Sequence, residues 1–342
     1  MKARLLQVPL YVLGLFAVLV LTLAVFGLPI GKSLALMAQG AFGDKFGVSR
    51  TVVKTVPLVL TGLGIVVSWR ARMYNIGGEG QFLMGGLLGG VFFKLVGPNF
   101  PPILLMTGVV LACAVGGALY GWLAGWLYTR RGVETVISTI LLNFIALQVL
   151  AWAVTGPLQE PSRALPQSDA LPSAAMLAKF NPQMDLNAGV FVALGAMILV
   201  TLYLFWTTGG FELQVVGANA RVARANRIDT KRVQERAMLI SGALCGLAGG
   251  VELTGIAGRL DTSFSQQWGF LAIPVALLGG LHPVYVLLSA LYFGALLASS
   301  DQLSRFTPAG STLIYVIQAV AVLGLVGVQS IRMRKMTPQE AV

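Results

Sequence analysis

The chain has 342 residues, of which 56% are hydrophobic and only 11% are charged, and its formal net charge is +11. Soluble domains carry about 25% charged residues, so this composition excludes a soluble globular protein with a water-facing surface. It predicts an all-α integral membrane protein. The basic residues flank apolar segments, which indicates contact with membrane lipids at their anionic headgroups rather than with nucleic acid.

About ten apolar segments are candidates for transmembrane helices, each of which needs roughly 20 apolar residues. In chain order they are Val8–Ile30, Val52–Trp69, Gln81–Val96, Ile103–Tyr128, Val136–Thr155, Ala188–Trp206, Ala237–Ile256, Phe270–Leu278, Val284–Ala298 and Ser311–Val328. The eighth segment is too short to cross alone and is followed by the turn GGLHP. This pattern predicts a broken helix, which at membrane depth must be surrounded by protein or a water-filled cavity.

The distribution of Lys and Arg predicts the orientation. If the N-terminus is cytoplasmic, most of the 24 basic residues fall on the cytoplasmic side, as the positive-inside rule requires. An even number of spans then returns the basic C-terminal stretch RMRKMTPQEAV to the same side. Residues 156–186, which contain five prolines, form an extracytoplasmic loop in this topology, and residues 208–236 form a cytoplasmic loop with short helices.

Glycines recur at intervals of four residues within two apolar segments. Gly117, Gly121 and Gly125 follow this spacing, as do Gly85 and Gly89. Small residues at this interval allow helix backbones to approach closely in a membrane. We therefore expect these two segments to pack tightly against neighbouring helices.

Carboxylates inside apolar segments are candidates for function, because such groups usually face a cavity or a partner. Glu79, in the stretch MYNIGGEGQFLMGG, opens a helix, where its charge favours the positive end of the helix dipole. It either caps that helix or lines a permeation route. Glu252, in LAGGVELTG, either lines the route or makes a buried structural hydrogen bond. Asn143, in ILLNFIA, either bonds a neighbouring helix or contacts a substrate.

No set of residues suggests an enzyme. The sequence has no Ser/His/Asp arrangement, no metal-ligand spacing and no paired carboxylates, so we expect neither catalytic nor metal-binding residues and no cofactor bound by this chain. GLPIGKS, at residues 27–33, has three residues between its first glycine and the Gly-Lys pair, whereas a phosphate-binding loop needs four. If transport is driven by ATP, another subunit hydrolyses it.

Four stretches together resemble the permeases of ABC importers of the branched-chain amino acid and ribose type, and the nucleoside-uptake branch in particular. MYNIGGEGQFLMGG is similar to that family's NIG-x-EGQ segment, and ETVISTILLNFIA to its NEVI-T-I-LNYIA segment. VVGANARVARANRI, followed by AMLISGALCGLAGGVELTG, looks like the family's cytoplasmic coupling loop and next span. FLAIPVALLGGLHP looks like the stretch before its broken helix. Where the family usually has Ala-Gly before the isoleucine of the coupling loop, this chain has Asn226 and Arg227.

The resemblance implies that residues 1–342 form a single transmembrane permease domain in a bacterial cytoplasmic (inner) membrane, with both termini cytoplasmic. It implies three kinds of protein partner: a second, homologous permease in a heterodimer, ABC ATPase subunits that carry ATP-Mg, and an extracytoplasmic substrate-binding lipoprotein. ATPase closure would push on the coupling loop. The residues expected to take part are Gly217, Asn219, Arg221, Arg224 and Arg227. The alternative for this loop is a basic surface that faces lipid headgroups.

The expected function is therefore import of nucleosides by alternating access, powered by separate ATPase subunits. A nucleoside is neutral but rich in hydrogen-bonding groups, so its route should offer polar side chains. Those expected on the route are Asn75, Glu79, Gln81, Asn143 and Glu252. The alternatives are an ABC permease for sugars or branched-chain amino acids, and a stand-alone proton-coupled secondary transporter that uses Glu79 or Glu252 as its proton site.

Overall fold

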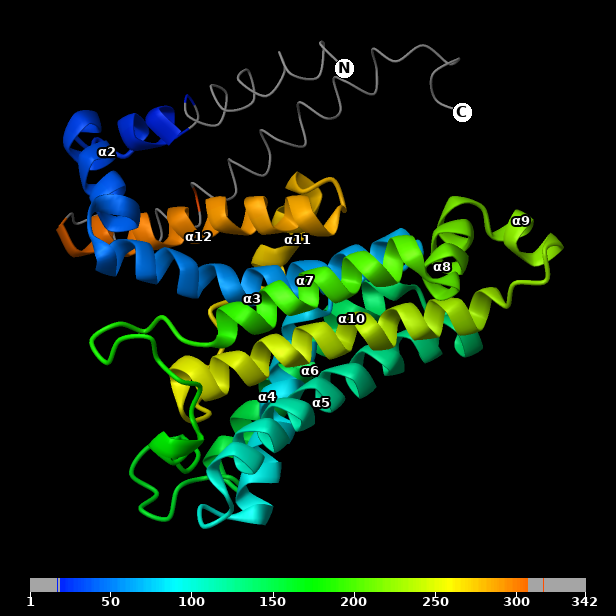
Figure 1. The fold of residues 1–342 in the computed structure, drawn as a ribbon, viewed down its shortest axis with the longest axis horizontal. Helices are drawn as coiled ribbons and strands as arrows, with labels where there is room; N and C mark the ends of the chain where they lie inside the picture. The colour runs from blue at the N-terminus through cyan, green and yellow to red at the C-terminus, as the bar shows by residue number, and fades with distance from the viewer. Residues whose placement is uncertain (1–16, 18, 307–315, 317–342) are drawn as a thin grey trace. The chain divides into compact units, whose positions relative to one another are not determined.

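The computed structural model of the chain describes residues 17, 19–306 and 316 (Figure 1). Within these residues the fold is helical, and extended backbone is limited to isolated bridges such as that between Gln159 and Ser168. The all-α prediction is confirmed for this part of the chain. Most of the expected first span, Val8–Ile30, and almost all of the last, Ser311–Val328, lie outside the described residues.

Six helices in the described part are long and apolar enough to cross a membrane. They are α3 (Lys45–Arg70), α5 (Pro102–Arg131), α6 (Thr135–Thr155), α7 (Gly189–Trp206), α10 (Thr230–Glu252, continued by η3, Leu253–Ala257) and α12 (Pro283–Phe306). The expected number of about ten is therefore not confirmed. The expected broken helix is present: α11 (Trp268–Leu278) has only 11 residues, and a turn with positive φ at Gly280 and Leu281 separates it from α12.

The chain divides into two compact units, one made of residues 52–291 and the other of residues 1–51 and 292–342. Within the first unit, α4 (Gly78–Val96) packs against α5, α6, α10 and α11 (Figure 1). Glu79, Gln81 and several glycines lower its hydropathy, which explains why it is not among the six apolar spans. Because neighbouring helices cover most of its surface, α4 does not need an apolar face for lipid.

Glycines form the contact between α5 and α10. A Cβ atom placed on Gly117 would lie 2.6 Å from the Cα of Gly246, and one placed on Gly242 would lie 3.0 Å from the Cα of Gly121. No real side chain fits at such distances, so the two backbones are in direct contact. The close packing that we expected from the glycine spacing is confirmed for these positions.

The loop of residues 156–186, which contains the short helix η2 (Ser173–Ala175), closes one end of this unit (Figure 1). Its backbone donates hydrogen bonds to the carbonyl oxygens at the end of α10 and η3, from Leu177 to Thr254 at 2.8 Å and from Leu171 to Gly258 at 2.8 Å. The side chain of Asn187 donates to the carbonyl of Gly255 at 3.2 Å. These bonds satisfy carbonyl groups that a helix end otherwise leaves without partners.

The second unit contains a helical stretch at residues 19–25, α2 (Ile30–Ala38), the π-helical turn η1 (Gln39–Gly43) and the last part of α12. Leu23, Met37, Leu296 and Leu303 form its apolar core. The hydroxyl of Ser299 donates to the carbonyl of Met37 at 2.8 Å and ties α12 to α2.

Candidate functional site

A buried amide pair holds the chain just before α4. The side-chain nitrogen of Asn75 donates to Gln81 Oε1 at 2.9 Å, and the amide nitrogen of Gln81 donates back to Asn75 Oδ1 at 3.1 Å. Asn75 also donates to the hydroxyl of Ser241 on α10 and accepts from the backbone N–H of Gly77. Both side chains are almost fully buried. Their hydrogen-bonding groups are therefore used within the protein, and the pair fixes the entry into α4.

Asn143 provides a cap for α4 from a different helix. Gly77, the residue before the helix, has no side chain, so the first N–H groups of α4 lack the usual local acceptor. Asn143, on α6, accepts from the N–H of Gly80 at 2.8 Å and donates to the carbonyl of Ile76 at 2.9 Å. The inter-helix hydrogen bond that the sequence left open is present in the structure.

Glu79 lies between the starts of two helices. It occupies the first turn of α4, and its Oε2 accepts a hydrogen bond from the backbone N–H of Gly269, in the first turn of α11, at 2.9 Å. Only 3% of Glu79 is exposed. The N-termini of both helices carry partial positive charge, and one carboxylate compensates both. The sequence predicted the contact with α4 itself, but not that with α11, which lies 190 residues further along the chain.

Glu252 is not part of this group. It ends α10, immediately before the π-helical turn η3, and it lines a cavity of about 10 Å³ together with Val53, Pro57 and Asn187. A cavity of this size has room for about one water molecule. The structure therefore brings four of the five expected pathway residues together at the start of α4 and places Glu252 elsewhere. In the described part of the chain, no three His, Cys, Asp or Glu side chains are grouped to hold a metal ion.

The expected coupling residues lie on α8 (Thr208–Ala218), α9 (Ala220–Ala225) and the turn that follows them. Gly217 packs against the end of α3, where an added Cβ would lie 2.9 Å from the backbone carbon of Arg70. Asn219 caps α9, because its Oδ1 accepts from the N–H groups of Arg221 at 2.9 Å and Val222 at 3.3 Å. Both residues thus determine how α8 and α9 are held.

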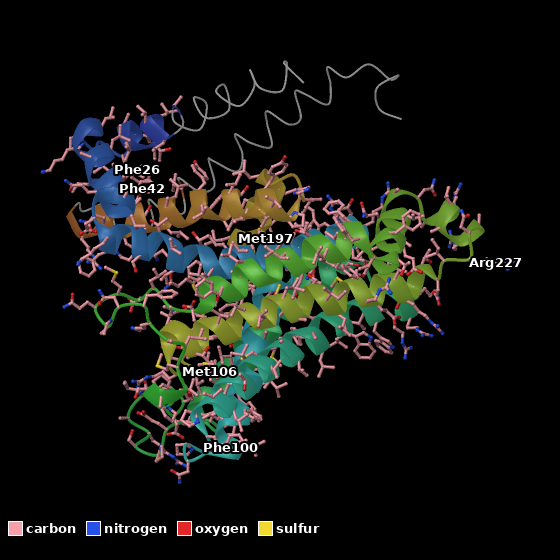
Figure 2. The ribbon with its side chains drawn as sticks, in the orientation of Figure 1. Phe26, Phe42, Phe100, Met106, Met197 and Arg227 are labelled. Atoms are coloured by element: carbon pink, nitrogen blue, oxygen red, sulfur yellow. The ribbon has the colours of Figure 1, made fainter. Side chains whose placement is uncertain are left out.

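Arg221, Arg224 and Arg227 are exposed, and none of their guanidinium groups forms an ion pair within the residues that the structure describes. Arg227 lies at the tip beyond α9, while Phe100 lies at the opposite end of the same unit (Figure 2). Three unpaired cations spaced three residues apart form a surface that suits an acidic partner.

Arg227 also has an unusual backbone conformation, with φ at 60°. The N–H of Arg227 donates to the carbonyl of Arg224, and the N–H of Ile228 donates to that of Ala223, both at 3.0 Å. This pair of bonds is the Schellman motif, in which the residue after the helix usually is glycine. The sequence comparison within the family placed glycine at this position, and the structure explains that preference.

A second group of residues was missed at the sequence level, where Arg70 served only as a marker of orientation. Its Nε donates to the carbonyl of Leu281 at 2.8 Å, and its Nη1 donates to Gln214 on α8 at 3.2 Å. The guanidinium lies 5.2 Å from the ring of Phe205, which stacks on His282 with ring centroids 5.3 Å apart. This arrangement, which we call the Arg70 cluster, joins the end of α3 to α8 and to the turn between α11 and α12.

The charge of His282 follows from its surroundings in the Arg70 cluster. Burial, and then the positive charge of Arg70, hold the pKa of His282 below its usual range. The imidazole is therefore neutral at neutral pH. The sequence left two roles open, satisfying a helix end or shuttling protons. The backbone of His282 takes part in both helix ends, because its N–H donates to Gly279 and its carbonyl accepts from Val286, each at 3.0 Å.

The family model described as "branched-chain amino acid transport system / permease component" matches residues 47–325. Among curated proteins, the chain is 32% identical to a guanosine ABC transporter permease protein of Bacillus subtilis, NupP, over 94% of this chain and 92% of the relative. A second guanosine permease of the same organism, NupQ, is 26% identical over 82% of this chain and 92% of the relative. A glucose ABC transporter permease protein of Haloferax volcanii is 31% identical over 83% of this chain and 77% of the relative.

The resemblance seen in the sequence motifs is thus supported over most of the chain, including the segments that hold the start of α4 and the coupling residues. The chain belongs to the family of permease components of branched-chain amino acid transport systems.

Proposed function

We propose that the chain is a permease subunit of an ATP-driven importer for nucleosides. The observation that carries this proposal is the match to the guanosine permease of Bacillus subtilis, which extends over 94% of this chain and 92% of the relative at 32% identity. The six apolar helices of the described part support a multi-pass membrane protein. Transport proceeds by alternating access, in which the permease opens to one side of the membrane and then to the other.

The proposed assembly contains a second, different permease subunit. Bacillus subtilis has two distinct guanosine permeases, and both match this chain. This supports a heterodimer. ABC ATPase subunits with ATP-Mg bind its cytoplasmic face, and an extracytoplasmic lipoprotein delivers the nucleoside. The chain lies in a bacterial cytoplasmic (inner) membrane with both termini in the cytoplasm.

In this assembly α8, α9 and the Arg70 cluster transmit movement from the ATPase to the spanning helices. The exposed cations of α9 meet acidic groups of the ATPase. Gly217 and Gln214 lie on α8 and contact Arg70, which in turn holds the turn before α12. A displacement of α8 therefore reaches α3 and α12 through two hydrogen bonds and one close backbone contact. Residues 208–236 act as the coupling loop and residues 156–186 as the extracytoplasmic loop.

Uptake of labelled substrate tests the proposed function. Bacterial cells that produce the chain together with the products of its neighbouring genes should accumulate guanosine, and deletion of this chain alone should abolish the accumulation. Labelled glucose and leucine serve as competing substrates. The glucose permease of Haloferax volcanii makes glucose the second candidate. Accumulation of glucose without guanosine would replace nucleosides by sugars as the cargo.

A further inference from the structure

One face of α6 carries an unusual line of side chains. Phe144, Gln148 and Trp152 are four residues apart, so they lie one above the other on the same side of the helix. All three are exposed, Phe144 to 62% and Trp152 to 65%. With Ile145 and Val149 they line an open groove with a volume of about 390 Å³. We call this surface the α6 groove.

Gln148 does not suit a surface that faces lipid. It lies seven residues before the end of α6, which places it about 10 Å along the helix axis from that end. Its amide has no hydrogen-bond partner within the described part of the chain. The exposed hydroxyls of Thr107 and Thr155 instead donate to carbonyls of their own helices, each at 2.8 Å. An unsatisfied amide in hydrocarbon is strongly unfavourable, so the α6 groove must meet a polar partner.

We propose that the α6 groove contacts the base of the nucleoside during transport, an inference that rests on the proposed function. Phe144 and Trp152 present aromatic faces on which a base can stack, and stacking of this kind tolerates different bases. Gln148, between them, offers two N–H donors and a carbonyl acceptor for the edge of the base. The groove is open on one side, so it binds weakly, as a transport pathway requires.

Cysteine labelling tests whether the α6 groove meets water and substrate. The native Cys113 and Cys245 are fully buried, which gives a low background. In the complete transporter in membranes, a water-soluble thiol reagent should modify Gln148→Cys, and guanosine should slow the reaction. The matched control is Ile198→Cys, halfway along α7, where the replaced side chain is 53% exposed and the neighbours are apolar; this residue should not react.

Two results would overturn the inference. If Gln148→Cys is as unreactive as Ile198→Cys, the α6 groove faces lipid or is covered by another protein such as the second permease. If it reacts at a rate that guanosine does not change, the groove meets water but not the nucleoside.

Uptake provides an independent measurement and separates the inference from the proposed function. Gln148→Leu should lower guanosine uptake about five- to tenfold at equal expression, the loss expected for one hydrogen bond. Phe191→Leu, at a similarly exposed aromatic residue on α7, should leave uptake unchanged. If the wild-type transporter takes up guanosine and both variants match it, the α6 groove is not the contact. If the wild type takes up no guanosine, the proposed function fails and the inference fails with it.

Discussion

Arg227 shows how a single backbone conformation bears on function. Its positive φ of 60° is favourable for glycine and costs a residue with a side chain about 1 kcal/mol or more. Neither of the two hydrogen bonds of the Schellman motif uses the side chain of Arg227. An arginine at this position therefore gives no advantage to the fold, and strained residues often occur at functional sites. We attribute the residue to contact with the ATPase.

Arg227→Gly should separate stability from coupling. Removing the strain should raise the free energy of unfolding by about 1 kcal/mol, while loss of the guanidinium should raise the amount of ATP hydrolysed per guanosine imported. Thermal unfolding in detergent and a coupled ATPase and uptake assay measure the two quantities. The control is Arg163→Gly in the loop of residues 156–186, where φ is 51°; it should raise stability without changing coupling. Unchanged coupling in Arg227→Gly would remove the role assigned to this side chain.

Glu79→Gln tests whether the buried carboxylate serves transport. Glutamine keeps an oxygen that accepts the N–H of Gly269 but removes the negative charge between the two helix starts. We expect guanosine uptake to fall while the amount of protein in the membrane is maintained. Glu160→Gln, at an exposed carboxylate that accepts from Ser162 and Gln167, is the control and should change neither quantity. A lower yield with normal uptake per molecule would assign Glu79 to helix capping alone.

The residue types at these sites were predictable, but their partners were not. Asn143 was expected to bond another helix or a substrate, and only the fold reveals that it caps α4. Glu79 was expected to act on its own helix, whereas its closest partner is Gly269. The Arg70 cluster was missed because Arg70, Gln214 and Leu281 are far apart in sequence and each has an ordinary local explanation. Long-range contacts of polar residues leave no periodic pattern in a single sequence.

At the scale of helices, the glycine contact between α5 and α10 is the most sharply constrained feature. Gly117 and Gly121 on α5 face Gly242 and Gly246 on α10. The spacing in α5 was visible in the sequence, and so was the prediction of close packing. The identity of the partner helix was not, because small residues occur in several segments.

Gly117→Val should prevent correct folding, because an added Cβ already lies 2.6 Å from the Cα of Gly246 and neither backbone can move freely. We expect little folded protein in the membrane, measured by fluorescence-detected size-exclusion chromatography. The control is Gly195→Val on α7, where nothing lies within 4 Å of an added Cβ, and it should fold normally. Folding of both variants to the same extent would show that α5 and α10 are not in direct contact.

The exposed face of α9 allows a second test at this scale. Replacing Arg221 and Arg224 together by Glu reverses two unpaired charges without removing any contact within the described residues. The double variant should insert normally and hydrolyse ATP without guanosine uptake. The matched control replaces both residues by Lys, which keeps the charge and should retain most of the uptake. Normal uptake by the Glu variant would favour the alternative in which this face contacts lipid headgroups.

At the scale of the whole molecule, composition and motifs predicted the membrane class and the family, and the family model and relatives confirm the latter. The number of spans was less predictable. Hydropathy counts segments as if each faced lipid, but α4 is enclosed by other helices and carries charged and polar residues that such a count penalises. The exposed amide of Gln148 was overlooked for a related reason, since the sequence does not reveal which side of a span is covered.

The proposed division of labour predicts that the chain does not transport by itself. Purified chain in liposomes should not accumulate guanosine, with or without a proton gradient, because its energy source is on another polypeptide. Addition of the second permease, the ATPase subunits and the binding protein should restore ATP-dependent uptake. Accumulation by the chain alone under a proton gradient would establish the alternative, a stand-alone secondary transporter that uses Glu79 or Glu252.

The π-helical turn η3 has a consequence for how the length of this protein can vary. Such a turn closes its hydrogen bonds over one residue more than an α-turn does, so it holds one surplus residue. Deleting one residue between Leu253 and Ala257 would convert it to regular helix and rotate everything downstream by about 100°. The glycines of α10, all upstream, would keep their register. Insertions and deletions among relatives should therefore accumulate at this turn, where evolution can re-aim the loop without disturbing the helix pair.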